Sequence, residues 1–197
     1  MEAPDITQLL GEWRLGNAGA RDQLVQLLYP ELRRQAQQVF RRESACQTLQ
    51  PTALVHEAWL RLSGHALAPA ANDRSHLLAI TARLMREILV DHARRRNAIK
   101  RDGGLRVSLS DPDFPAASTS ATPDMLSLDR ALEQLETVDA VKARVVELRY
   151  FGGLSVEETG TALELSPATV KRHWQAARVW LFNALNNPPE DALSRRD

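Results

Sequence analysis

One short stretch near the end of the chain carries cationic and amide side chains at helical spacing. Guanidinium and ammonium groups pair with phosphates, and amide groups hydrogen-bond to the edges of bases. No acidic residue occurs between positions 166 and 185 to oppose a polyanion. The chemistry indicated is DNA binding, and a solvated basic face on an ordinary helical hairpin is the alternative. The side chains concerned are Lys171, Arg172, Gln175 and Arg178.

Two helices joined by a short turn are predicted to position this basic face. Ser155 and Glu158 form a Ser-x-x-Glu capping box, which predicts that the first helix begins there. Ser166 offers an N-cap oxygen for the second helix, and Pro167 suits its first position. About three residues remain for the turn, as in a helix-turn-helix. Glu164 stands where such turns often carry Gly, and a left-handed backbone there would cost about 1 kcal/mol.

The second helix also has an apolar stripe, which predicts the side that packs inward. Val170, Trp174, Ala177 and Leu181 follow one another at steps of four, three and four residues. The remaining side of the helix is then free to meet DNA. Its predicted DNA-binding residues are Ser166, Pro167, Ala168, Thr169, Lys171, Arg172, His173, Gln175 and Arg178.

The composition points to an all-α protein without enzyme chemistry. Aromatic residues make up only 5% of the 197 residues, and β-branched runs are sparse. The single cysteine, Cys46, excludes an internal disulfide and fits a reducing compartment. No signal segment or membrane span is predicted, so we expect a cytoplasmic protein. No carboxylate pair, metal cluster or phosphate loop is recognisable, and we expect neither catalysis nor a cofactor nor a metal.

Charge is segregated along the chain although the formal net charge is zero. From residue 102 to residue 139, eight acidic residues face two basic ones. A basic run directly precedes this acidic segment, and segregated charge creates local fields that the overall sum hides. The basic run consists of Arg94, Arg95, Arg96, Lys100 and Arg101.

We expect two small helical domains joined by a flexible linker. The N-terminal domain covers 1–101, and the segment 102–122, with paired Gly and several Pro, Ser and Thr, has linker composition. A four-helix domain over 123–186 contains the helix-turn-helix, and 187–197 forms a tail. Helices are predicted near 6–15, 21–42 with a kink or restart at Pro30, 51–62, 75–99, 123–136, 139–150, 155–163 and 167–186.

Three segments in this order resemble the extracytoplasmic-function (ECF) sigma factors of bacterial RNA polymerase. They are PTALVHEAWLRL at 51–62, SHLLAITARLMREILVDHARRR at 75–96 and RVVELRYFGGLSVEETGTALELSPATVKRHWQAAR at 144–178. The resemblance extends over nearly the whole chain. It implies a promoter-specificity subunit that binds core RNA polymerase and promoter DNA, both as duplex and as melted strand. The last of the three segments resembles the domain for the −35 promoter element.

The first segment resembles the helix by which the family docks on the clamp region of the largest polymerase subunit. Its apolar face and mixed polar face suit a groove or another helix. A plain bundle helix is the alternative from the residues alone. The resemblance implies polymerase contact by Leu54, His56, Glu57, Trp59, Leu60 and Arg61.

The second segment resembles the part that reads and opens the −10 element. Its arginines can neutralise phosphates, whereas a solvated helix end favoured by the helix dipole is the alternative. Residues 77–96 include no Phe, Trp or Tyr on which a base would stack, so polar residues before the helix are the candidates for holding a flipped base. These candidates are Asn72, Arg74, Ser75 and His76, and the cationic ones are Arg83, Arg86, Arg94, Arg95, Arg96, Lys100 and Arg101.

Two other functions stay open at this point. A free-standing helix-turn-helix regulator would bind duplex DNA tightly by itself, without polymerase. A helical interaction protein would use its basic surfaces to bind an acidic partner. An anti-sigma factor is an open further partner, and neither a membrane nor a small-molecule substrate is expected.

Overall fold

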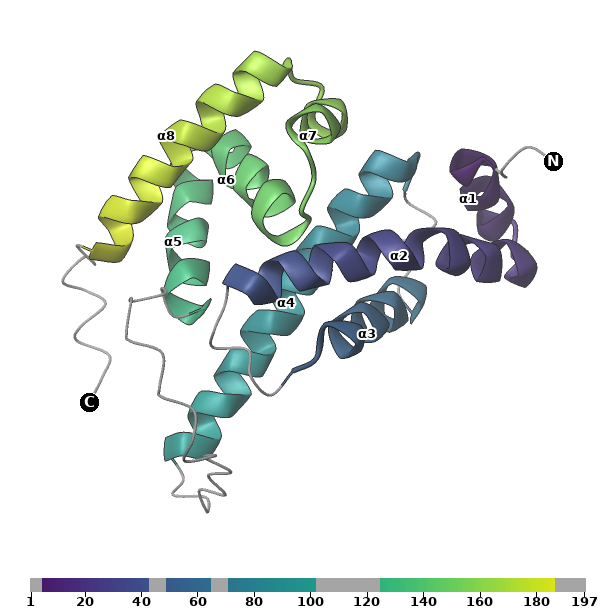
Figure 1. Ribbon diagram of the computed structural model, residues 1–197, viewed down its shortest axis with the longest axis horizontal. Helices are drawn as coiled ribbons and strands as arrows, with labels where there is room; N and C mark the ends of the chain where they lie inside the picture. Colours follow the sequence, from purple (N-terminus) through teal and green to yellow (C-terminus); the bar gives the residue numbers. More distant parts are fainter. Residues whose placement is uncertain (1–4, 43–48, 65–70, 102–124, 187–197) are drawn as a thin grey trace.

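The computed structural model describes residues 5–42, 49–64, 71–101 and 125–186, and within these ranges it contains helices and no strand (Figure 1). The predicted all-α fold class is confirmed. The helices are α1 (Ile6–Arg14), α2 (Ala18–Arg42), α3 (Pro51–Gly64), α4 (Arg74–Arg101), α5 (Met125–Val138), α6 (Ala140–Val146), the π-helical turn η1 (Glu147–Phe151), α7 (Val156–Leu163) and α8 (Pro167–Asn186).

Two helices differ from their predicted course. α2 begins at Ala18 and continues through Pro30, so the helix does not restart there. Proline removes only one helical hydrogen bond, and Leu28 and Leu32 on either side of it are buried in the core and hold both parts together. The helix predicted for 139–150 changes after α6 into η1, where the Gly152 amide donates to the Glu147 carbonyl at 3.1 Å.

The predicted caps of α7 and α8 are present. The Glu158 amide donates to Ser155 Oγ at 3.0 Å, and the Ser155 amide donates to Glu158 Oε2 at 2.8 Å, which completes the capping box. At the start of α8 the Thr169 amide donates to Ser166 Oγ at 3.2 Å. These bonds satisfy amides that have no partner inside the helix.

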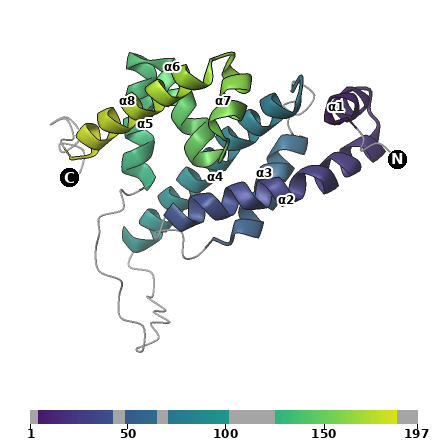
Figure 2. The same cartoon turned by 45° about the horizontal axis from the view of Figure 1, so that its top comes forward.

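The helices fall into an N-terminal half, α1–α4, and a C-terminal half, α5–α8, which pack against each other. α4 contacts α5, η1 and α7, and α2 also contacts η1. Figure 1 shows α5–α8 grouped on one side of the long helices α2 and α4, and the turned view in Figure 2 agrees. The predicted linker 102–122 and the tail 187–197 lie outside the described residues, and the division into domains stays a prediction.

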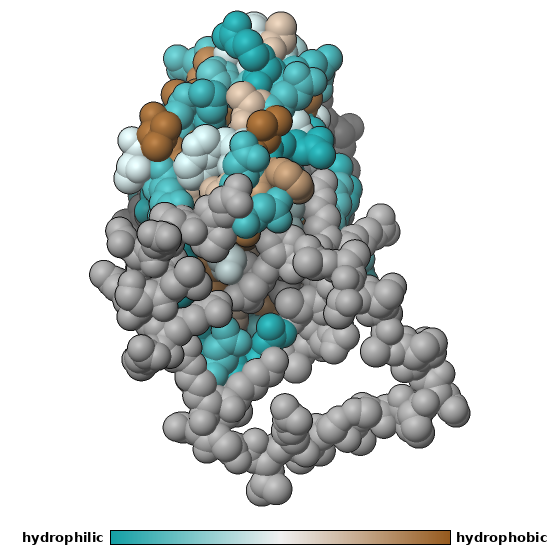
Figure 3. All heavy atoms as spheres, turned by 90° about the vertical axis from the view of Figure 1, so that its left-hand side faces the viewer, coloured by the Kyte–Doolittle hydropathy of each residue, from teal (hydrophilic) through white to brown (hydrophobic). Residues whose placement is uncertain are grey.

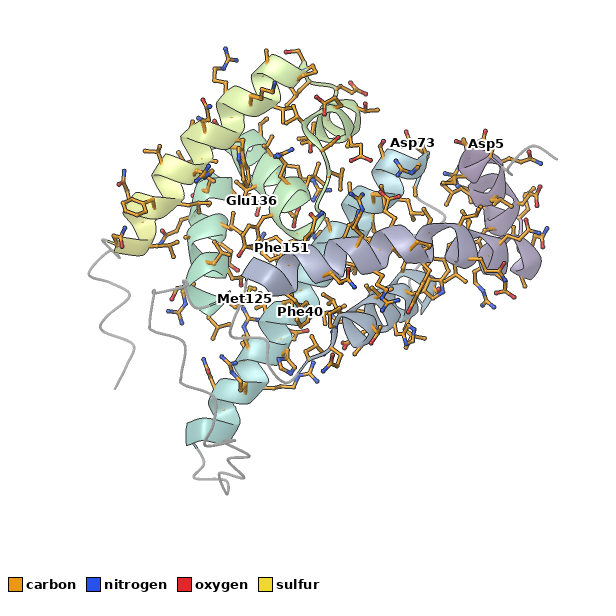
Figure 4. The ribbon with its side chains drawn as sticks, in the orientation of Figure 1. Asp5, Phe40, Asp73, Met125, Glu136 and Phe151 are labelled. Atoms are coloured by element: carbon orange, nitrogen blue, oxygen red, sulfur yellow. The ribbon has the colours of Figure 1, made fainter. Side chains whose placement is uncertain are left out.

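One continuous apolar core joins the two halves. Figure 4 shows Phe40, Met125 and Phe151 near one another where α2, α5 and η1 meet, and all three belong to this core or pack on it. Phe151 and Leu148 of η1 are fully buried. Burial of a side chain of this size contributes roughly 1.5–3 kcal/mol. The side chains of η1 therefore form part of the core that joins the two halves.

The turn between α7 and α8 has a left-handed residue at the position where such turns often carry Gly. Glu164 has φ 56° and ψ 39°, and it is the one non-glycine with positive φ among the described residues. A side chain in this backbone region costs roughly 1–2 kcal/mol, which glycine avoids.

Replacing Glu164 with Gly should therefore stabilise the protein by about 1 kcal/mol and raise Tm by roughly 2–4 °C. Chemical denaturation followed by circular dichroism measures the change. Glu164→Ala is the matched control, because it removes the carboxylate but keeps the Cβ atom. An equal gain in the Ala variant would assign the effect to charge and contradict the backbone explanation.

Candidate nucleic-acid interface

The basic side of α8 is exposed and its apolar side is buried. Val170 and Ala177 are fully buried and Leu181 nearly so, whereas Gln175 lies in solvent. Trp174 is half-buried on the same inner side. The predicted orientation of the helix is therefore correct. The exposed residues among the predicted set are Ser166, Pro167, Ala168, Lys171, Arg172, Gln175 and Arg178.

Arg149 of η1 fixes α8 against the turn that precedes α7. Its guanidinium lies 5.3 Å from the centre of the Trp174 ring, and its Nη1 donates to the Leu154 carbonyl at 3.2 Å. The interaction of a cation with the face of an indole ring is favourable by about 0.5–2 kcal/mol. Arg149 therefore connects η1, α8 and the turn before α7, and helps to fix the orientation of α8. Arg149 carried no functional prediction, and its spacing within the apolar pattern gave no signal for one.

Two predicted base-reading residues of α8 are less exposed than the rest. Thr169 is half-buried, and its Oγ1 lies 2.8 Å from Ser166 Oγ at the cap. His173 is half-buried and near Asp139, the N-cap of α6. Hydrogen bonds from the Lys142 side chain and amide lower the pKa of Asp139, and His173 lowers it further. Gln175, by contrast, is exposed.

The arginines of α4 differ in their exposure and in their partners. The Arg94 side chain is 61% exposed, and Arg95 is exposed with its Nε donating to the Asp91 carbonyl at 3.3 Å. Arg83 is exposed and pairs with Glu87 one turn on at 3.2 Å. Arg96 is half-buried. The side chains of Lys100 and Arg101 lie outside the described residues.

Arg86 faces the C-terminal half and not solvent. Its side chain is 14% exposed and pairs with Asp129 of α5 at 2.8 Å and with Glu147 of η1 at 3.7 Å. In this arrangement Arg86 is closed to DNA, although the sequence placed it on the outer surface. Both acids were missed at the sequence level. A signal was available, because each acid stands alone among apolar residues that face the core. A buried carboxylate requires a cationic or hydrogen-bonding partner, so each position predicts such a partner.

The polar residues before α4 form a compact corner. The backbone N–H of Asn72 donates to His76 Nδ1 at 3.3 Å, and the backbone N–H of His76 donates to Asp73 Oδ1 at 2.8 Å. Asn72 and His76 are exposed, and Ser75 is half-buried. Arg14 of α1 also donates to Asn72 Oδ1 at 3.4 Å. The structure therefore brings the predicted base-holding residues together at one end of α4.

Arg74, the remaining member of this corner, is held by acids from two other helices. It pairs with Glu31 of α2 at 2.5 Å and with Glu158 of α7 at 3.4 Å. Burial alone would raise the pKa of Glu158, but hydrogen bonds from Ser155 and Arg74 bring it below its ordinary value. Glu158 therefore serves the α7 cap and the contact between the two halves with the same carboxylate.

α3 presents part of the predicted polymerase face to solvent. Leu60 is 70% exposed and His56 is exposed, whereas Leu54 is fully buried and supports the helix from within the core. Trp59 is half-buried, and its ring stacks on Trp13 with centroids 5.6 Å apart. The Arg61 guanidinium pairs with Glu57 at 2.8 Å and with Asp91 of α4 at 3.2 Å. Burial lowers the pKa of Arg61, but these two acids outweigh burial and raise it above the ordinary value.

Comparison with models of protein families shows to which family the chain belongs. The family model for the ECF sigma factor matches residues 3–187. The chain belongs to the ECF sigma factor family. A comparison with curated proteins finds no match.

Membership of the ECF sigma factor family implies a role as an RNA polymerase sigma factor that binds core polymerase and promoter DNA. It places the protein among transcription factors rather than in a known class of enzymes. None of the described helices combines the length and apolar character that crossing a bilayer requires. The face of the molecule in Figure 3 is largely hydrophilic where it is coloured, with isolated apolar residues between.

Proposed function

We propose that the protein directs promoter-specific initiation, with one DNA element assigned to each half. The C-terminal half places α8 in the major groove of the −35 element. The N-terminal half binds the clamp region of core polymerase through the exposed side of α3 and holds the melted −10 strand along α4. The halves correspond to domains 1–101 and 123–186, with 102–122 as the tether that joins their two weak contacts into one tight one.

One observation supports this function most directly: α8 exposes an acid-free face while its opposite side is buried. A rigid helix of this kind fits the major groove, where side chains reach phosphates and base edges. Lys171, Arg172 and Arg178 bind phosphates in this proposal. Gln175 is assigned the main base contact, and the less exposed Thr169 and His173 contribute at the edges.

The test uses the full chain, core RNA polymerase and promoter DNA from the source genome. The chain should be retained on immobilised core polymerase, and the resulting holoenzyme should initiate at a defined set of start sites. DNA binding should weaken with salt, with a log–log slope near −0.9 for each duplex phosphate contacted. Tight sequence-specific binding by the chain alone, with no retention on core polymerase, would instead support a free-standing regulator.

A further inference from the structure

The second half of α8 borders a groove that neither of the two proposed DNA contacts uses. The groove lies where α8 packs against α5 and against the segment formed by α6 and η1 (Figure 1). Its volume is about 650 Å³, within the range of roughly 300–1,000 Å³ that small-molecule sites in proteins span. Apolar side chains from these elements line it, among them Leu128 of α5, Val146 of α6 and Leu185 of α8.

Three aromatic rings form much of the wall of this groove. They belong to Tyr150 of η1 and to Trp174 and Phe182 of α8. The Arg149 guanidinium lies 5.3 Å from the centre of the Trp174 ring, so this part of the wall is held in place without a ligand. Flat rings on a fixed scaffold favour a planar apolar molecule that stacks on them.

Part of the apolar lining of the groove faces water. Phe182 is 67% exposed and Val179 is 63% exposed, whereas Leu181 between them along the chain is buried. A molecule that covers the exposed side chains removes their apolar surface from water, and this removal stabilises the complex. Packing among the described residues leaves this source of free energy unused.

A single positive charge lies at the mouth of the groove. Arg178 is the one charged residue of the lining; it is exposed, and no described residue forms an ion pair with it. Gln175 is also exposed and lies three positions earlier, on the same side of α8. A guanidinium binds a carboxylate through two parallel hydrogen bonds, and a side-chain amide donates a further one. The complementary ligand is therefore an anion.

We propose that this groove binds a small organic anion with a planar apolar body. The body stacks among the rings of Tyr150, Trp174 and Phe182, and its carboxylate pairs with Arg178 and accepts a hydrogen bond from Gln175. Arg178 disfavours cationic ligands, and the apolar walls disfavour ions without an apolar body, such as inorganic phosphate. Binding at this site requires neither DNA nor polymerase.

Occupation of the groove has a consequence for promoter recognition, and this consequence rests on the proposed function. Arg178 and Gln175 are there assigned to a phosphate and to a base of the −35 element. A carboxylate that engages both side chains withdraws them from the duplex. The anion and the −35 element therefore compete for α8, and the bound anion lowers affinity for the promoter.

The first measurement is a titration of the full, isotope-labelled chain with naphthoate, followed by nuclear magnetic resonance. The indole N–H signal of Trp174 should shift and saturate with a dissociation constant of roughly 0.1–1 mM. Arg178→Gln should weaken naphthoate binding at least about 5-fold, because a charged hydrogen-bond partner is lost. Naphthamide, the uncharged analogue, should bind the parent chain and Arg178→Gln equally.

Matched controls separate the groove from the general surface of the protein. Arg130→Gln removes an exposed cation of α5 outside the lining and should leave naphthoate affinity unchanged. Phe182→Ala removes an aromatic wall and should weaken naphthoate and naphthamide alike, by about 5–10-fold. Asn183→Ala, at the next position of α8, should weaken neither. All of these residues are exposed, so the variants should remain folded, which circular dichroism checks.

The second measurement is the affinity of the reconstituted holoenzyme for promoter DNA with and without naphthoate. A saturating concentration should weaken binding by roughly 5-fold or more, because contacts to a phosphate and to a base are lost. Naphthamide leaves the charge of Arg178 free to pair with phosphate, so its effect should be smaller.

The outcomes distinguish failure of the ligand site from failure of the proposed function. Absence of a saturable Trp174 shift up to about 10 mM naphthoate would overturn the site, and so would equal naphthoate affinity of Arg178→Gln and the parent chain. A groove that only a protein partner covers would give one of these results. Saturable binding with the expected variant effects, together with unchanged promoter affinity, would support the site and reject the assignment of Arg178 and Gln175 to the −35 element.

Discussion

Replacing Arg172 and Gln175 together with Ala should lower promoter-directed initiation by at least about 30-fold. Arg172 and Gln175 lie on the exposed face of α8, and each well-formed contact to a base or phosphate accounts for roughly 1–3 kcal/mol. Retention on core polymerase should not change, because α3 lies in the other half. Mapping of transcript starts with reconstituted holoenzyme measures the effect.

Asn183→Ala is the matched control for this variant. Asn183 is exposed on α8 beyond the predicted DNA-binding residues, so its replacement should leave start sites and yield unchanged. Promoter selection that stays the same in the Arg172 and Gln175 double variant would contradict the assignment of α8. It would favour an interaction protein that uses this basic face for an acidic partner.

Replacing Phe151 with Ala should reduce the free energy of unfolding by about 3–5 kcal/mol. Phe151 is fully buried in η1, and its ring meets the Tyr150 ring edge-on with centroids 5.0 Å apart. Truncation removes the buried ring and leaves a cavity at the junction of the two halves. Denaturant titration measures the loss, and Tm should fall by roughly 6–20 °C.

Phe182→Ala distinguishes burial from the mere loss of an aromatic ring. Phe182 is 67% exposed on α8, so its truncation should change stability by no more than about 0.5 kcal/mol. Similar losses for the two phenylalanine variants would contradict the central place of Phe151 in the core. A loss below about 1 kcal/mol for Phe151→Ala would do the same.

Several features of the site could be predicted because they depend on neighbours within one helical turn. The capping box of Ser155 and Glu158 and the cap at Ser166 were predicted and are present, and Glu164 is left-handed at the position where the sequence lacks the usual Gly. The buried stripe of α8 could be predicted because its apolar residues recur at the spacing of a helix, every three or four positions. Local hydrogen bonds and periodicity need no knowledge of the rest of the chain.

The ion pairs of Arg86 could not be predicted from neighbours along the chain. A periodic pattern placed it beside other arginines of α4, yet its partner Asp129 lies 43 positions further along the chain. An arginine is equally compatible with water, phosphate or a buried carboxylate, and only the packing of α5 against α4 selects among them. The same holds for Leu54, whose burial removes it from the exposed side of α3.

By itself, the amino-acid sequence determined the all-α class, most helix boundaries and the basic face of α8, since each arises from interactions between residues close along the chain. Tertiary packing decided the π-helical turn η1, which ends at Gly152, a residue so close to α4 that an added Cβ would lie 2.9 Å from Ala82 Cβ. It also decided which arginines meet solvent and which meet Asp129 and Glu147. Contacts between distant segments form only when the halves bury their shared apolar surface, and that burial selects the pairing.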